Sequence, residues 1–169
     1  DDPYYIGAIG ALGAGSSNSL SKDTDLALAV GTKLGDFTTG SWANFENEDF
    51  KLVSINTTRF DVTKHRATPV ISDAKIGFQE LSKALGDWKA PNIWFDRAVK
   101  ERTEWNSYVD KESGPTNQEL PSYAHAVGAI YRNADPSDIV VTAAGGLVGE
   151  VVQIWKPKQK NTFETEWGF

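Results

Sequence analysis

The segment VVTAAGGLVGEVVQIW, residues 140–155, places two adjacent glycines between a strand-like run and a helix-like run. At such a turn, backbone N–H groups and the positive end of a helix dipole can bind a phosphate. The spacing matches neither the G-x-G-x-x-G fingerprint nor the G-x-x-x-x-G-K-[ST] loop, and a tight turn also needs glycine for steric reasons alone. Gly145 and Gly146 therefore permit a phosphate site without requiring one.

A second glycine-rich stretch, GAIGALGAG at residues 7–15, follows a possible strand at residues 4–6. Its spacing is wrong for a dinucleotide-binding loop, and the next strand-like run ends in Gly31 and Thr32 instead of an acidic residue. We therefore interpret it as a loop over a sheet.

Other reactive side chains are scattered along the sequence. His65 and His125 are 60 positions apart with no metal-binding pattern around either, and the sequence contains no cysteine and no G-x-S-x-G elbow. We expect no metal ligand and no catalytic residue. The net charge of -6 and the pI near 4.9 argue against nucleic acid and anionic membranes as partners.

Three short apolar runs, at residues 26–30, 51–55 and 69–72, each end in a small or polar residue. This pattern is typical of buried parallel strands whose carboxyl ends open into loops. It predicts an α/β layer structure.

Helical patterns follow these runs. Asp73 can cap a helix that Gly86 ends, and a second amphipathic helix is expected over residues 93–110. A further helical stripe at residues 120–131 precedes a strand at residues 139–143. Helix, strand, glycine turn and helix in this order predict the opening of a second α/β unit.

The polar stretch DKESGPTNQELP carries two prolines and shows no periodicity, so we expect a linker there. The predicted division is a first domain at residues 1–110, a linker at 111–119 and an incomplete second domain at 120–169. The sequence has no methionine and closes on NTFETEWGF, which reads as an interrupted strand. We expect the chain to be part of a longer protein, and a processed N-terminus is the alternative.

Four segments carry a resemblance to a known family: LALAVGTKLGDFTTGSWANF, FDVTKHRATPVISDAKIGFQELSKALGDW, LPSYAHAVGAIYRNADPSDIVVTAAGGLVGEVVQIW and TFETEWGF. The chain resembles the thiamine-diphosphate-dependent enzymes. Within them it is most similar to the branch that hydrolyses a carbon–carbon bond of trihydroxycyclohexane-1,2-dione in inositol degradation. Trp167 departs from the Glu-Tyr-Gly-Phe that is usual in that branch.

The resemblance implies a three-layer middle domain with a parallel sheet, of the NAD/FAD-binding type, followed by the first α/β unit of a thiamine-diphosphate-binding fold. It also implies that a five-residue turn faces the cofactor diphosphate: Ala144, Gly145, Gly146, Leu147 and Val148. The implied cofactors of the whole enzyme are thiamine diphosphate and Mg²⁺.

The family's activating glutamate and its Gly-Asp-Gly magnesium motif have no counterpart in this sequence. We therefore expect the chain alone to be inactive and to bind neither cofactor. For the whole enzyme, the resemblance implies a small cyclic polyol dione as substrate, a homodimer or homotetramer, and a cytoplasmic location.

Two alternatives remain open. An acetolactate-synthase-like carboligase shares the middle-domain layout, although carboligases usually have a different turn where TAAGGL stands. The chain could instead be a non-catalytic nucleotide-binding or structural module, because related middle domains bind FAD in some members.

Overall fold

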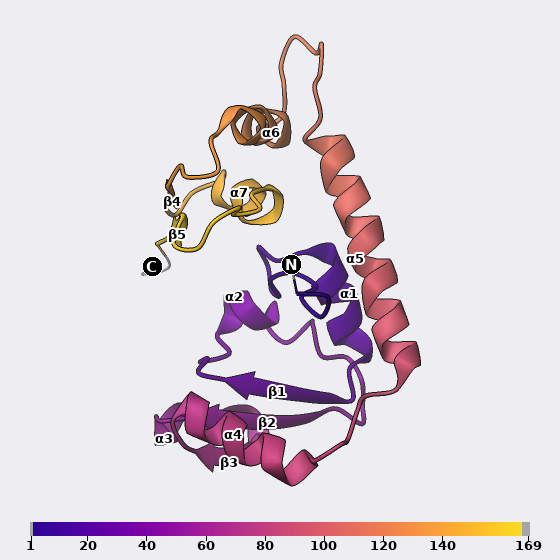
Figure 1. Ribbon diagram of the computed structural model, residues 1–169, viewed down its shortest axis with the longest axis vertical. Helices are drawn as coiled ribbons and strands as arrows, with labels where there is room; N and C mark the ends of the chain where they lie inside the picture. The colour runs from indigo at the N-terminus through magenta and orange to yellow at the C-terminus, as the bar shows by residue number, and fades with distance from the viewer. Residues whose placement is uncertain (1, 167–169) are drawn as a thin grey trace.

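The computed structural model describes residues 2–166, arranged around two small parallel sheets (Figure 1). The first part of the chain forms α1 (Gly15–Asp23), β1 (Leu26–Val30), α2 (Asp36–Thr39), β2 (Lys51–Asn56), α3 (Arg59–Val62), a 3-10 turn (Lys64–Arg66), β3 (Thr68–Ile71) and α4 (Ala74–Leu85). The rest forms α5 (Asn92–Glu112), α6 (Tyr123–Asn133), β4 (Val140–Thr142), α7 (Val148–Ile154) and β5 (Phe163–Thr165).

The three predicted strands are confirmed as one parallel sheet in the order β1-β2-β3. Leu52 and Ile55 of the central strand are buried, as expected for a strand with neighbours on both edges. Helix α4 lies against β2 so closely that a Cβ at Gly77 would sit 2.7 Å from Ile55 Cγ2. The mixed α/β fold with parallel sheets is therefore confirmed.

The predicted caps of α4 are also confirmed. The Asp73 carboxylate accepts hydrogen bonds from the N–H groups of Lys75 at 2.9 Å and Ile76 at 3.2 Å. Gly86 ends the helix with φ of 55°, a conformation that glycine adopts without strain. Helix α5 is confirmed and is slightly longer than residues 93–110.

Two expectations need correction. Residues 4–6 form no strand, because none of the described segments pairs with them; Tyr4 and Tyr5 are instead largely exposed. Helix α6 begins at Tyr123, later than expected, because the Ser122 side chain accepts a hydrogen bond from the His125 N–H and caps it there. The closing strand is confirmed as β5, and Trp167 lies outside the described residues.

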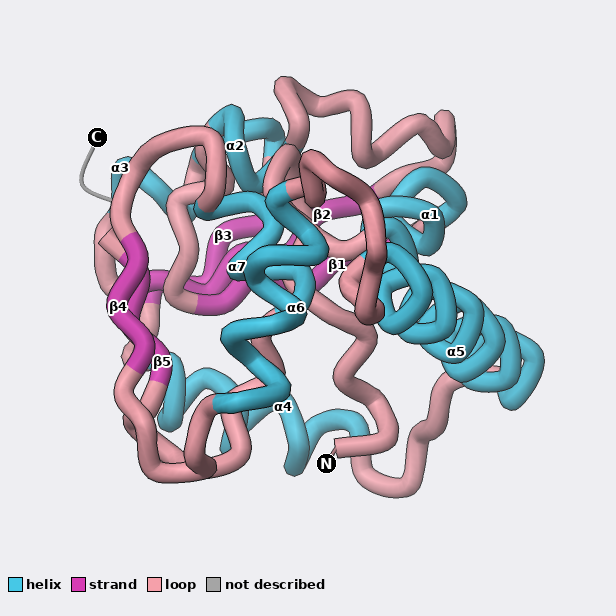
Figure 2. The backbone as a smooth tube through the Cα atoms, turned by 90° about the horizontal axis from the view of Figure 1, so that it is seen from above, coloured by secondary structure: helices cyan, strands magenta, loops and turns pink. Residues whose placement is uncertain are grey.

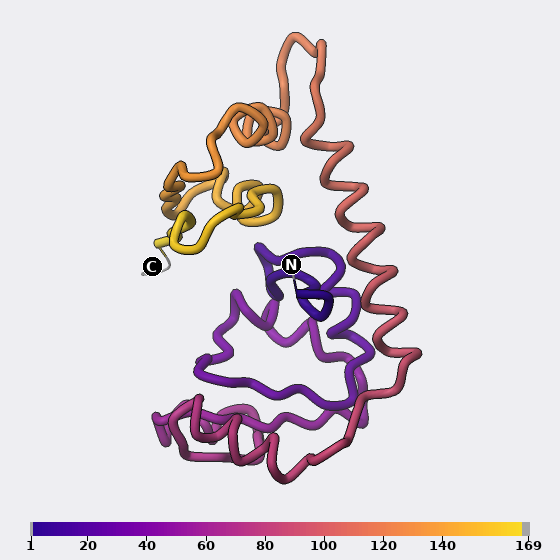
Figure 3. Tube along the Cα trace, in the orientation of Figure 1, coloured from indigo at the N-terminus to yellow at the C-terminus, as the bar shows by residue number. Residues whose placement is uncertain are grey.

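Helix α5 connects the two halves of the molecule (Figure 1) and lies at one side of it when seen from above (Figure 2). It packs against α1, where a Cβ at Gly15 would lie 2.7 Å from the Trp105 ring. Near its end, Val109 joins Val127, Val151 and Ile154 in a buried cluster with α6 and α7. The helix thus contacts elements of both halves, and residues 113–122 form a long loop before α6 (Figure 3).

Candidate functional site

The glycine turn lies where the sequence places it, between the carboxyl end of β4 and the start of α7. Strand β4 pairs in parallel with β5, with Val140 opposite Phe163 and Thr142 opposite Thr165. Ligands of open parallel sheets bind outside the carboxyl ends of the strands, so the turn lies at the end of the sheet where a ligand is expected.

Four of the five turn residues are exposed, from Ala144 to Leu147, while Val148 is buried at the start of α7. Gly145 has φ of 139°, which is strained for any residue with a Cβ, and nothing lies within 4 Å of the place where its Cβ would be. The backbone of this turn is therefore open to a ligand.

The peptide groups of the turn are available as donors. Within residues 2–166, the N–H groups of Ala144, Gly145, Gly146 and Leu147 donate no hydrogen bond to a backbone carbonyl or a side chain. Backbone N–H groups of this kind are suitable partners for an anion. One feature opposes a phosphate: Glu150 places a carboxylate in the first turn of α7.

The two histidines have partners outside the glycine turn. The His65 ring lies 4.2 Å from the Trp42 ring, and its Nε2 lies 3.2 Å from the carbonyl oxygen of Leu34. The His125 Nδ1 lies 2.7 Å from Ser122 Oγ, in a capping box at the start of α6. In the part of the chain that the structure describes, no three His, Cys, Asp or Glu side chains come together as a metal site.

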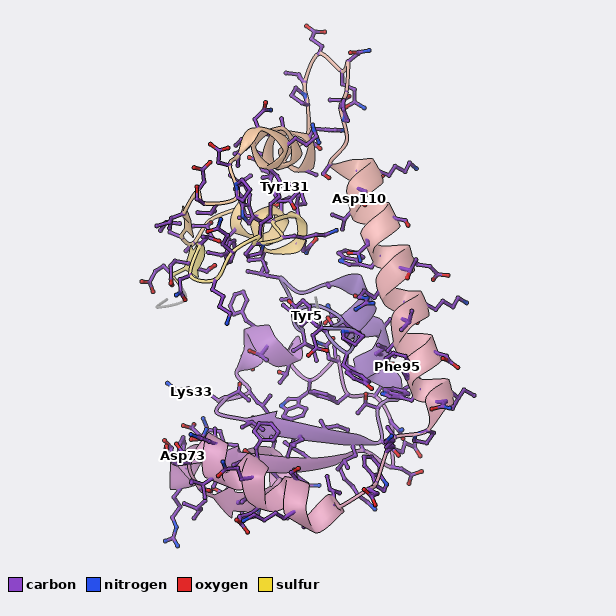
Figure 4. All side chains as sticks on the ribbon, viewed as in Figure 1. Tyr5, Lys33, Asp73, Phe95, Asp110 and Tyr131 are labelled. Atoms are coloured by element: carbon purple, nitrogen blue, oxygen red, sulfur yellow. The ribbon has the colours of Figure 1, made fainter. Side chains whose placement is uncertain are left out.

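A cleft of about 740 Å³ was not expected from the sequence. It lies between the N-terminal segment, α5 and the end of α7, near the Tyr5 and Asp110 side chains in Figure 4. Arg102 forms part of its wall: its Nη1 donates to the carbonyl oxygens of Asp2, Pro3 and Tyr5 at 3.1–3.2 Å. These partners are about 100 positions apart, so no local pattern could have indicated the cleft.

Comparisons with known proteins first show which class of protein the chain resembles. Residues 1–81 match the model of the thiamine pyrophosphate enzyme central domain. This match, with the parallel α/β fold, confirms the resemblance to the thiamine-diphosphate-dependent enzymes. None of the helices within residues 2–166 is long and apolar enough to cross a membrane.

The particular relatives are 3D-(3,5/4)-trihydroxycyclohexane-1,2-dione hydrolases. The chain is 30% identical to that of Clostridium tetani, with 97% of the chain and 29% of the relative covered. It is 27% identical to those of Geobacillus thermodenitrificans and Clostridium perfringens, with 99% of the chain and 29% and 30% of the relatives covered. The chain thus spans under a third of the length of these relatives.

Proposed function

We propose that this chain is part of a thiamine-diphosphate-dependent hydrolase that opens the ring of trihydroxycyclohexane-1,2-dione by hydrolysing a carbon–carbon bond in inositol degradation. The observation that carries the proposal is the similarity to hydrolases of that name, which extends over 97–99% of the chain. It therefore includes the glycine turn as well as the central-domain segment.

The contribution of this chain to the cofactor site is the turn formed by Ala144, Gly145, Gly146, Leu147 and Val148. The exposed, unpaired N–H groups of Ala144 to Leu147 fit the oxygens of a diphosphate, which would be bound by backbone donors without a cationic side chain. Thiamine diphosphate, when bound, supplies an electron sink for carbon–carbon bond cleavage. Mg²⁺ would be bound by residues outside this sequence, since oxygen ligands with the required pattern have no counterpart here.

In this proposal the chain by itself neither binds the cofactors nor turns over substrate. Residues 1–110 form most of the middle domain, 111–119 the linker and 120–169 the start of the diphosphate-binding domain. The complete enzyme would act in the cytoplasm as a homodimer or homotetramer on a small cyclic polyol dione.

A chimera tests the proposed activity. The 169 residues replace the matching 29% of the Clostridium tetani hydrolase, and the purified chimera is assayed for ring opening of trihydroxycyclohexane-1,2-dione with thiamine diphosphate and Mg²⁺. Ring opening supports the proposal. A folded chimera that binds thiamine diphosphate but forms acetolactate from pyruvate instead would favour the carboligase alternative.

Calorimetry of the 169-residue chain tests whether the chain binds the cofactors by itself. We expect no heat of binding with thiamine diphosphate plus Mg²⁺ or with FAD. Tight binding of thiamine diphosphate would contradict the assignment of its remaining ligands to polypeptide outside this sequence. Binding of FAD alone would favour the nucleotide-binding module.

A further inference from the structure

The glycine-rich loop at residues 7–14 belongs to no helix or strand, yet side chains of α1 hold it in one conformation. The Asn18 Oδ1 accepts a hydrogen bond from the Gly10 N–H, and the Asn18 Nδ2 donates to the Gly10 carbonyl, both at 2.9 Å. The buried Ser17 hydroxyl donates to the Ala8 carbonyl. A loop this rich in glycine is flexible by itself, so these bonds determine its shape.

The loop is also attached to α2. The Ala11 N–H donates to the carbonyl of Phe37 at 2.7 Å. Gly10 has φ of 110°, and a Cβ there would lie 2.1 Å from the same carbonyl oxygen, so only glycine permits this approach. The loop is therefore held from two sides, by α1 and by α2.

Leu12 extends from this loop to α7, which lies above the indigo start of the chain in Figure 1. Its Cδ2 is 3.4 Å from the position that a Cβ on Gly149 would occupy. Leu12 thus contacts the first turn of α7 at a residue that has no side chain. Gly149 follows Leu147, the last exposed residue of the glycine turn, by two positions.

The two ends of α7 are supported differently. Val151 and Ile154, in its second half, belong to the buried cluster that α7 shares with α5 and α6. Among the described residues, the first turn of α7 contributes no side chain to that cluster, although Val148 is buried. The loop therefore supports the end of α7 that adjoins the glycine turn.

We propose that Leu12 is a positioning residue for the glycine turn: the loop holds Leu12 against Gly149 and so fixes the direction of the N–H groups of residues 144–147. This inference rests on the proposed function of the turn as part of the diphosphate site. It adds that the central-domain segment, residues 1–81, determines the geometry of that turn. Donors that are already aimed at an anion bind it more tightly, because binding does not have to order them.

Nitrogen-15 relaxation of the 169-residue chain tests the positioning directly. Leu12→Val removes Cδ2, the atom that approaches Gly149, and keeps an apolar side chain. We expect the order parameters of the Leu147 and Gly149 amides to fall from about 0.85 to below about 0.6, whereas that of Val151 stays near its original value. Leu12→Met can reach Gly149 again and should restore the order. The matched control is Leu120→Val, the same change at a leucine that is 86% exposed, and it should alter none of these amides.

A second measurement needs no variant and therefore remains decisive if Leu12→Val fails to fold. In the unaltered chain, we expect a nuclear Overhauser effect between a Leu12 δ-methyl group and the Gly149 α-protons, because these groups are in contact. Absence of this signal, with both groups assigned, would overturn the proposal.

The consequence for the cofactor is measured in the Clostridium tetani chimera described above. If Leu12→Val reduces the population of the correctly oriented turn to about a fifth, the dissociation constant for thiamine diphosphate at constant Mg²⁺ should rise about fivefold. The value of kcat at saturating cofactor should change less than about twofold, since the turn binds the diphosphate and takes no part in bond cleavage. Leu12→Met should restore the affinity, and Leu120→Val should leave it unchanged.

Two further outcomes would overturn the proposal. The first is an unchanged dissociation constant for Leu12→Val in a chimera that binds thiamine diphosphate. The second is an equal loss of order at Leu147 and Val151, which would mean that Leu12 only supports the fold as a whole. A chimera with Leu12 intact that fails to bind thiamine diphosphate would instead refute the proposed function, and the relaxation measurement on the 169-residue chain would still decide whether Leu12 orders the turn.

Discussion

Helix α6 approaches the end of α5 so closely that position 128 accepts only glycine. A Cβ on Gly128 would lie 2.0 Å from the carbonyl oxygen of Ser113 and 2.8 Å from its Cβ. The same carbonyl accepts a hydrogen bond from Arg132 Nη1 at 2.5 Å, one turn further along α6. Gly128→Ala therefore forces apart the two helices at the joint between the halves of the molecule.

The expected destabilisation can be worked from these contacts. Alanine stabilises a helix by about 1 kcal/mol relative to glycine. Against this, the Ser113 carbonyl must move by more than about 1 Å to reach a normal contact distance, and overpacking of this kind costs about 1–3 kcal/mol. Weakening of the Arg132 hydrogen bond adds about 1–2 kcal/mol. We expect Gly128→Ala to lower the free energy of unfolding by about 1–4 kcal/mol.

Urea unfolding followed by tryptophan fluorescence measures this change, because Trp105 and Trp155 pack against the buried cluster of α5, α6 and α7. The matched control is Gly149→Ala in α7, whose added Cβ would meet only Leu12 Cδ2 at 3.4 Å. The control should leave the free energy of unfolding unchanged or raise it by up to about 1 kcal/mol. If both variants shift the urea midpoint in the same direction, steric contact at position 128 is not the cause and the reasoning fails.

Three further predictions concern the rest of the fold. Gly77→Ala should lower the free energy of unfolding by about 1–2 kcal/mol in urea titrations, because its Cβ would meet the buried Ile55 side chain at 2.7 Å; equal or higher stability would contradict this contact. Asp73→Ala should lower the free energy of unfolding by about 1 kcal/mol because it removes the cap of α4, while Asp73→Asn should retain most of that stability. Thermal melts of the two variants distinguish the loss of a cap from the loss of a charge. Arg102→Gln should speed chymotrypsin cleavage after Tyr5 several-fold, because it releases the N-terminal segment. The free energy of unfolding should change by no more than about 1 kcal/mol. Unchanged cleavage would mean that other contacts hold the segment.

The parts of the fold that local physics determines could be predicted from the sequence. The apolar runs of β1, β2 and β3 and the two caps of α4 each depend on residues close together in the chain. The prediction of a strand at residues 4–6 was wrong, because an apolar run becomes a strand only where a neighbouring strand offers hydrogen bonds.

The candidate site shows the same limit. The turn at Gly145 and Gly146 was found from the order of strand, glycines and helix, all within one stretch of sequence. The cleft beside Arg102 was not found, because its walls come from the N-terminal segment, α5 and α7. What the turn binds stays a prediction, since an open backbone selects for an anion without specifying which one.

Helix α5 has a mechanical consequence. Its 21 residues span about 30 Å of straight helix, with α1 packed near one end and α6 and α7 near the other. A small tilt at the start of this helix would therefore move its far end, and with it α7, the helix that follows the glycine turn. Heat should therefore melt both halves in one cooperative step, because neither can loosen without withdrawing support from the other.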